Sequence, residues 1–205
     1  MKLHWSPRSP FVRKVMVVAH ERNLTDKLDC VRTVAISDAP SAELMADNPL
    51  NKIPCMVLDD GSVLQDSRVI CEYLDALDGA PVLFPQGEDR WSALRRQALG
   101  DGFLDLMIVW RHERIRPENL HLHSYLDAYR QKAEATLDRL NAEIPARTGF
   151  DIGDVSIGCA LAYADFRYAD LEWRKGRDDL ARWFADIEAR QSFIATQIVN
   201  DGPAR

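Results

Sequence analysis

The hydrophobic pattern of the chain changes at residues 77–87, and this change limits the possible folds more than any other feature. The stretch reads LDGAPVLFPQG and holds two prolines and two glycines, residues that interrupt helices and strands. Before this stretch, short apolar runs that predict strands alternate with segments in which apolar residues recur every three or four positions, as in helices. After it, only the helical spacing of apolar residues occurs. We therefore predict an α/β domain over residues 1–77, a connector over 78–87 and an all-helical domain over 88–205.

The first domain is predicted to have the element order βαβαββα. Ser9-Pro10 precedes apolar residues at helical spacing, and Asp59-Asp60-Gly61 separates two short apolar runs as the turn of a hairpin does. The predicted strands cover residues 1–5, 28–34, 55–58 and 62–64, and the predicted helices 11–22, 41–46 and 66–77. The second domain is predicted to be a helical bundle, with helices over residues 89–116, 118–144, 154–169 and 178–199.

The composition predicts a globular protein with no nucleic-acid, membrane or metal partner. The chain has 26 Lys and Arg against 32 Asp and Glu, a formal charge of −6, which argues against a phosphate backbone as the main partner. Its most apolar stretch, FLDLMIVW, is far shorter than the roughly 20 residues of a membrane helix, and the first residues lack the apolar run of a signal peptide. The four cysteines are scattered without a CxxC pair, as reduced thiols of a cytoplasmic protein would be, and they indicate neither a disulfide framework nor a metal site.

Three short motifs admit both an ordinary structural role and a binding role. Pro54 stands immediately before a predicted strand, where a proline cannot donate a ladder hydrogen bond. Asp66-Ser67 begins a predicted helix, and such a position suits a helix cap but also offers free N–H groups to a carboxylate. Ser9 and Ser6 each precede a proline, and either serine is suited to begin the first helix; the helical spacing favours Ser9.

Four segments together resemble the cytosolic glutathione transferases. They are SPRSPFVRKV, NPLNKIPCMVLDDG, QDSRVICEYLD and FDIGDVSIGCALAYADFR, and they extend in this order over nearly the whole chain. Each segment is a weak signal alone, but their order and spacing make the resemblance specific, and the first and last look most like bacterial members. The resemblance implies a thioredoxin-like first domain that holds glutathione, a helical second domain that supplies the pocket for a second substrate, and a homodimer.

The resemblance also implies a role for each binding motif. A cis Ile53–Pro54 bond would turn the backbone of Ile53 toward the cysteinyl part of glutathione, like one added strand rung. Ser67 and the free N–H groups beside it would hold the γ-glutamyl carboxylate, and Asp66 the neighbouring ammonium. Family members usually carry Glu where this chain has Asp66, so that contact is expected to shift. Lys52 would meet the glycyl carboxylate, or it is an ordinary surface lysine.

Ser9 is the candidate catalytic residue that the resemblance implies. The family places Ser, Tyr or Cys at this position, aimed at the glutathione sulfur, where a hydroxyl donor and a helix N-terminus favour the thiolate. The predicted function is therefore conjugation of the glutathione thiolate to a small, hydrophobic electrophile, with glutathione as co-substrate and without metal or nucleotide.

Two alternatives to this function stay open on the sequence alone. One is a non-catalytic protein of the same fold that binds glutathione or a protein partner. The other is a glutathione-dependent reductase or lyase; a reductase usually needs a cysteine at the position of Ser9, so only Cys55 would support it. Asp151 and Asp154 match the helix-capping pair of the family, and we assign them to folding and not to catalysis.

Overall fold

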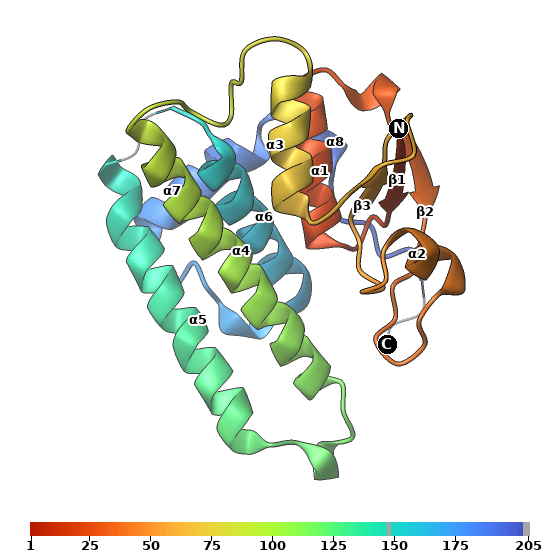
Figure 1. Ribbon diagram of the computed structural model, residues 1–205. Coiled ribbons are helices and arrows are strands. Elements are labelled where there is room, and N and C mark those ends of the chain that lie inside the picture. The colour runs from red at the N-terminus through yellow and green to blue at the C-terminus, as the bar shows by residue number, and fades with distance from the viewer. Residues whose placement is uncertain (147–148, 203–205) are drawn as a thin grey trace. The chain divides into compact units, whose positions relative to one another are not determined.

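The computed structural model describes residues 1–146 and 149–202, and these divide into two compact units. The first unit contains Met1–Arg90 together with Gln191–Asp201, and the second contains Trp91–Arg190 together with Gly202. The elements of both are drawn in Figure 1. The segment 78–87, predicted as a connector, clusters with the first unit, and so do residues 191–201, which the sequence pattern places in the helical domain.

A four-stranded sheet forms the centre of the first unit. Its strands are β1 (Lys2–Trp5), β2 (Asp29–Arg32), β3 (Cys55–Val57) and β4 (Val63–Leu64). They lie in the order β2-β1-β3-β4, with β1 parallel to β2 and antiparallel to β3, and β3 antiparallel to β4. Gly61, at φ +85°, provides the positive backbone angle that the β3–β4 turn needs. The predicted βαβαββα order of a thioredoxin-like domain is confirmed.

Two amphipathic helices, α1 (Pro10–Glu21) and α3 (Ser67–Leu77), lie side by side next to this sheet (Figure 1). Their apolar residues recur every three or four positions and face the core, where Val12, Val15, Ile70 and Leu74 are all buried. Two short helices complete the unit, α2 (Ala42–Asp47) and α8 (Gln191–Ala195), together with a 3₁₀ turn at Thr25–Lys27.

The second unit is helical throughout its described residues. Its helices are α4 (Asp89–Arg114, whose first two residues cluster with the first unit), α5 (His123–Glu143), α6 (Ile152–Arg167) and α7 (Asp178–Glu188), with 3₁₀ turns at Glu118–Leu120, Ile144–Ala146 and Ala169–Leu171. Helix α6 is buried around its whole circumference from residue 152 to 164, which is why its sequence is apolar without a polar face. Gly100 of α4 lets the two helices approach closely, because a Cβ there would lie 2.7 Å from the backbone nitrogen of Ile157.

Two predicted helices are wrong in extent. The prediction over 118–144 runs too far toward the N-terminus: α5 begins only at His123, because His121 and Leu122 have extended backbones and the Leu122 N–H donates to the Glu113 carboxylate at 2.7 Å. The prediction over 178–199 joins two helices, α7 and α8. The apolar side chains of α7 are buried in the second unit, whereas Phe193 of α8 is buried in the first.

None of the helices within residues 1–146 and 149–202 has both the length and the apolar character that crossing a membrane requires.

Candidate glutathione site

Ser9 caps the N-terminus of α1. Its backbone is extended (φ −80°, ψ 119°), and its Oγ accepts the N–H of Val12 at 3.3 Å. The side chain is partly exposed, and no residue of the described chain receives its hydroxyl proton. Ser6 differs, since it is only 7% exposed and its Oγ accepts the N–H of Arg8 at 3.4 Å. Of the two serines, Ser9 therefore has the more accessible hydroxyl.

The backbone of Ile53 lies just beyond the end of a strand ladder. The Ile53–Pro54 peptide bond is cis, as the resemblance implies. The β1–β3 pairing ends where His4 lies opposite Cys55, and Pro54 has no N–H to extend it. Within the described chain, neither the N–H nor the C=O of Ile53 bonds to another residue. These two groups can therefore pair with the backbone of a peptide ligand.

Two asparagines hold the loop that leads to Ile53, and the sequence analysis missed both. Asn48 is 2% exposed, and its side-chain amide donates to the carbonyl of Lys52 at 2.8 Å. Asn51 has a positive φ of 52°, and its side chain donates to the carbonyl of Ile36 at 3.0 Å. Their signal in the sequence is an asparagine on each side of the Pro49-Leu50 pair, since asparagine tolerates positive φ and bonds to nearby backbone. The side chain of Lys52 itself is exposed.

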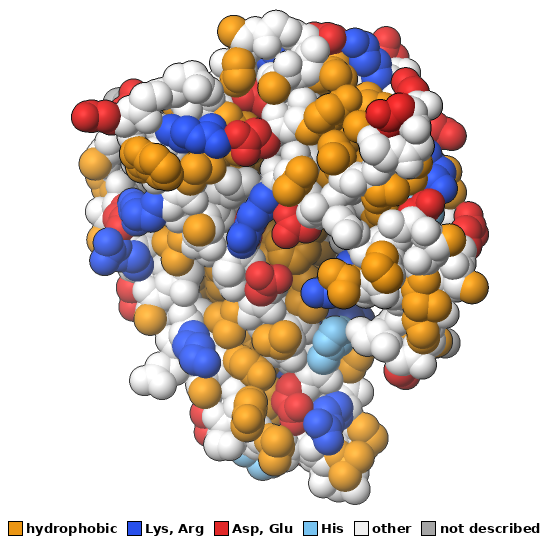
Figure 2. Space-filling view, viewed as in Figure 1, with side chains coloured by type: hydrophobic (Ala, Val, Ile, Leu, Met, Phe, Trp, Pro, Cys, Tyr) orange, Lys and Arg blue, Asp and Glu red, His pale blue; other side chains and the backbone are white. Residues whose placement is uncertain are grey.

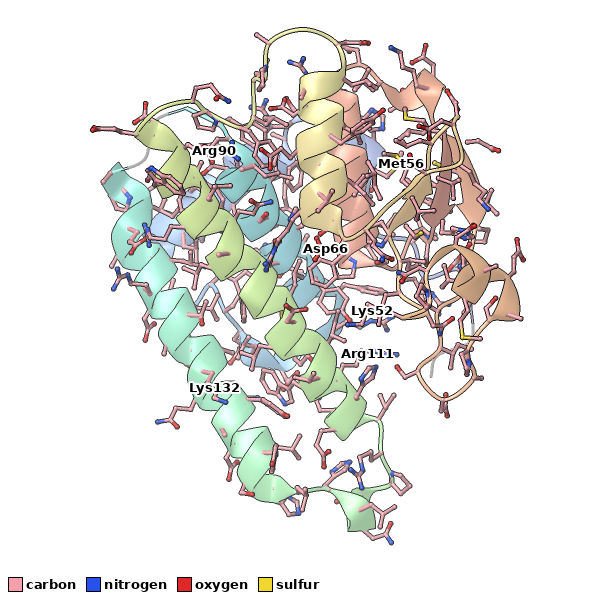
Figure 3. All side chains as sticks on the ribbon, viewed as in Figure 1. Lys52, Met56, Asp66, Arg90, Arg111 and Lys132 are labelled. Atoms are coloured by element: carbon pink, nitrogen blue, oxygen red, sulfur yellow. The ribbon has the colours of Figure 1, made fainter. Side chains whose placement is uncertain are left out.

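Asp66 and Ser67 lie at the N-terminal end of α3, as predicted. Asp66 is the N-cap, its Oδ1 accepts the N–H of Arg68 at 2.8 Å, and its side chain is exposed. Ser67 is the first helical residue and is 2% exposed; no described residue bonds to its hydroxyl. In Figure 3, Asp66 lies at this end of α3, and Lys52 extends from the loop before β3. A helix N-terminus with an unused hydroxyl and an exposed carboxylate offers one partner for each charge of an α-amino acid.

Cys55 does not provide a reactive thiol. It is 0% exposed in β3, and burial, aided by the charge of Asp47, raises the pKa of its thiol to about 11. A thiol with that pKa is almost wholly protonated at neutral pH, and the thiolate is the form that attacks disulfides. The one cysteine that would have supported a reductase is therefore unsuited to that chemistry.

Asp151 and Asp154 form a capping box at the start of α6. The Asp151 carboxylate accepts the N–H of Gly153 at 2.8 Å, and the Asp154 carboxylate accepts the N–H of Asp151 at 2.9 Å. Arg96 of α4 pairs with Asp151 in the same unit. The predicted structural role of both aspartates is confirmed.

Among the described residues, no three or more His, Cys, Asp or Glu side chains lie together in a group that could hold a metal ion. On the face shown in Figure 2, Lys and Arg side chains are interspersed with Asp and Glu. The candidate site consists of the backbone groups of Ile53, the hydroxyls of Ser9 and Ser67, the carboxylate of Asp66 and the ammonium of Lys52. This set of groups is suited to a small zwitterionic peptide.

A thioredoxin-like unit followed by a helical unit defines a class of two-domain protein. Comparisons with known protein families and solved structures identify the same class. Residues 8–77 match the glutathione S-transferase N-terminal domain, and residues 124–186 match the glutathione S-transferase C-terminal domain. This chain is 41% identical to a glutathione transferase family member from Pseudomonas fluorescens Pf-5 that was solved with bound glutathione. The two structures superpose with a TM-score of 0.91, and the match covers 97% of this chain and 98% of the Pseudomonas chain. The chain belongs to the glutathione transferase family.

Two further relatives extend over nearly the whole chain. A structure of a family member from the same Pseudomonas strain, bound to S-(propanoic acid)-glutathione, is 39% identical with a TM-score of 0.89, over 97% of this chain and 100% of that one. The GST-like protein YibF of Escherichia coli K12 is 29% identical over 205 residues, 96% of this chain and 98% of that protein.

Proposed function

We propose that the protein is a glutathione transferase that joins the sulfur of glutathione to a small, hydrophobic electrophile. The observation that carries this proposal is that the Ser9 hydroxyl has a hydrogen-bond partner for its oxygen but none for its proton among the described residues. Its oxygen accepts the Val12 N–H, while its proton is donated to no described residue, so the same group can cap α1 and donate to a sulfur.

Each part of glutathione has a partner in the candidate site. The N–H and C=O of Ile53 pair with the cysteinyl backbone. Ser67 and the first-turn N–H groups of α3 hold the γ-glutamyl carboxylate, Asp66 holds the ammonium, and Lys52 attracts the glycyl carboxylate. The bound glutathione in the 41% identical relative supports glutathione as the ligand of this chain.

The reaction then depends on the ionised sulfur. A free thiol has a pKa of about 8.5, so a donated hydrogen bond from Ser9 and the N-terminus of α1 increase the fraction of thiolate at neutral pH. The thiolate attacks an electrophilic carbon, a carbon–sulfur bond forms, and the leaving group departs with the bonding electrons. The S-(propanoic acid)-glutathione bound to the second Pseudomonas structure is a glutathione that carries a group on its sulfur, as a conjugation product does.

Ser9→Ala tests the role of the hydroxyl, with Ser6→Ala as the matched control. We expect Ser9→Ala to lower kcat by at least about tenfold, because each unit by which the thiol pKa rises leaves tenfold less thiolate. Glutathione affinity, measured by calorimetry, should change little, and Ser6→Ala should keep most of the activity. No affinity for glutathione in the millimolar range would contradict the proposed function altogether.

A non-catalytic glutathione-binding protein is the alternative that the same measurements separate. It would bind glutathione, convert none of a panel of electrophiles, and be unaltered by Ser9→Ala.

We further propose that the protein works as a homodimer in the cytoplasm. Sedimentation of the purified chain tests whether it is a homodimer.

A further inference from the structure

The C-terminal segment of the first unit packs along the helix that Ser9 caps. We call residues 191–201 the C-terminal clamp. Phe193 is 1% exposed; its carbonyl accepts a hydrogen bond from the Arg13 guanidinium at 3.2 Å, and its ring lies 5.1 Å from that guanidinium carbon. The Ser192 hydroxyl donates to the Glu21 carboxylate at 2.5 Å. The clamp therefore binds α1 both one turn after Ser9 and at its last residue.

The end of the clamp binds the loop that carries Ser9. The N–H of Val199 donates to the carbonyl of Pro7 at 3.4 Å. The Asp201 carboxylate pairs with Nε of Arg8 at 3.1 Å and with Nε of Arg32 at 2.6 Å. A second nitrogen of Arg32 bonds to the same carboxylate at 3.1 Å, so the contact is bidentate.

Asp201 thereby connects a strand of the sheet to a loop. Arg32 is the last residue of β2 and lies opposite Trp5 in the parallel pairing with β1, whereas Arg8 immediately precedes Ser9. The three side chains are 23–33% exposed, and a bidentate pair in such a setting restrains geometry better than one long surface pair. The hydrogen bond and the charge of Arg32, and to a smaller extent the charge of Arg8, hold the pKa of Asp201 below its usual range. The carboxylate is therefore ionised at neutral pH.

We infer that Asp201 is a positioning residue for Ser9: it fixes the loop of residues 6–9 against β2 and so sets where the Ser9 hydroxyl points. This inference rests on the proposed function. Position matters for such a donor because a displacement of about 1 Å can cost up to 10²-fold in rate.

The test compares Asp201→Asn and Asp201→Glu with Asp179→Asn. Asp179 forms an exposed pair with Arg182 on α7 at 2.9 Å, so its variant removes a similar surface charge elsewhere. We expect Asp201→Asn to lower kcat by about tenfold while KM for glutathione changes by less than about twofold. The ultraviolet absorbance of the bound thiolate should then titrate at higher pH. Asp201→Glu should recover most of the loss, and Asp179→Asn should match the unaltered protein.

The Ser9→Ala background separates positioning from a general loss of structure. If Asp201 acts through the Ser9 hydroxyl, Asp201→Asn should cost nothing further once that hydroxyl is gone. The same fold-loss in both backgrounds would overturn the inference, as would unaltered kinetics in Asp201→Asn.

Hydrogen exchange tests the same inference without glutathione. Amides of residues 6–16 should exchange faster in Asp201→Asn than in Asp179→Asn, and equal rates would overturn the inference. A protein that binds no glutathione yet shows faster exchange would contradict the proposed function while the link between Asp201 and the Ser9 loop stands.

Discussion

The four cysteines differ in exposure, and this difference makes the chemistry of single thiols testable. Cys30 is exposed, although partial burial of its sulfur and the neighbouring Asp29 raise the pKa of its thiol. Cys55 is buried, with its thiol pKa raised to about 11. We expect an alkylating reagent at neutral pH to modify Cys30 alone in the folded protein and all four cysteines in urea. Mass spectrometry of the digested protein measures this, with Cys30→Ser as the unlabelled control.

Labelling of Cys55 in the folded chain would contradict this expectation. It would also restore the reductase alternative, because a thiol that reacts at neutral pH must be both accessible and partly ionised.

Single residues at the site could be predicted only where the local sequence determines their role. Ser9 and Asp66 cap helices because of their immediate neighbours, and the capping geometry is observed. Asn48 and Asn51 could not be found in this way, because their importance comes from bonds to Lys52 and Ile36 that a loop forms only once folded. The proposed ligand roles of Ser9 and Asp66 rest on the family resemblance alone.

At the scale of one helix, the capping box of α6 permits a quantitative expectation. Asp154 is 0% exposed and accepts the N–H of Asp151. Asp154→Ala leaves that buried N–H without an acceptor, so we expect the free energy of unfolding to fall by about 1–3 kcal/mol. Urea unfolding measures the loss. Asp178→Ala, which removes an exposed acid from the first turn of α7, should cost less than about 1 kcal/mol.

An equal loss in the two variants would show that Asp154 contributes only its charge near the helix N-terminus. Restoration of stability by Asp154→Asn, which keeps an acceptor oxygen but no charge, would support the hydrogen bond instead.

Helix and strand types were predicted well, but helix ends were not. The apolar spacing of α1 and α3 is set locally, and both are found within about a residue of the prediction. The break between α7 and α8 has no proline or glycine to indicate it. It follows from where Phe184 and Phe193 are buried, in the second and first units respectively, and that is a property of the tertiary fold.

At the scale of the whole chain, the division of residues between the units was the least predictable feature. The helical pattern predicted over residues 178–199 continues past residue 190, yet residues 191–201 belong to the first unit, through contacts with α1 and with Arg8 and Arg32. Asp201 and its partner Arg32 are 169 positions apart in the sequence, and the local spacing of apolar residues does not predict a contact over that distance.

The stability of the whole molecule should depend on pH through carboxylates whose pKa is lowered by folding. Hydrogen bonds from His4 and then Lys2 lower the pKa of Asp47 in the first unit, and Arg95 lowers that of Glu143 in the second. A lowered folded-state pKa contributes stability above the unfolded-state value and loses it as pH falls through the folded-state value. We therefore expect the free energy of unfolding to be nearly constant above about pH 5 and to fall between about pH 5 and 2.

Asp47→Ala isolates one contribution to this decline. His4 is 0% exposed and its Nε2 lies 2.8 Å from the Asp47 carboxylate, so the variant should lose about 1–3 kcal/mol at pH 7 by leaving a buried ring nitrogen unpaired. The difference from the unaltered protein should shrink as the pH falls below about 4, because Asp47 of the unfolded chain then binds a proton before Asp47 of the folded protein does. Urea unfolding across this pH range measures both curves, with Asp127→Ala on the exposed face of α5 as control. A difference independent of pH would mean that Asp47 stabilises the fold by packing alone and not by its charge.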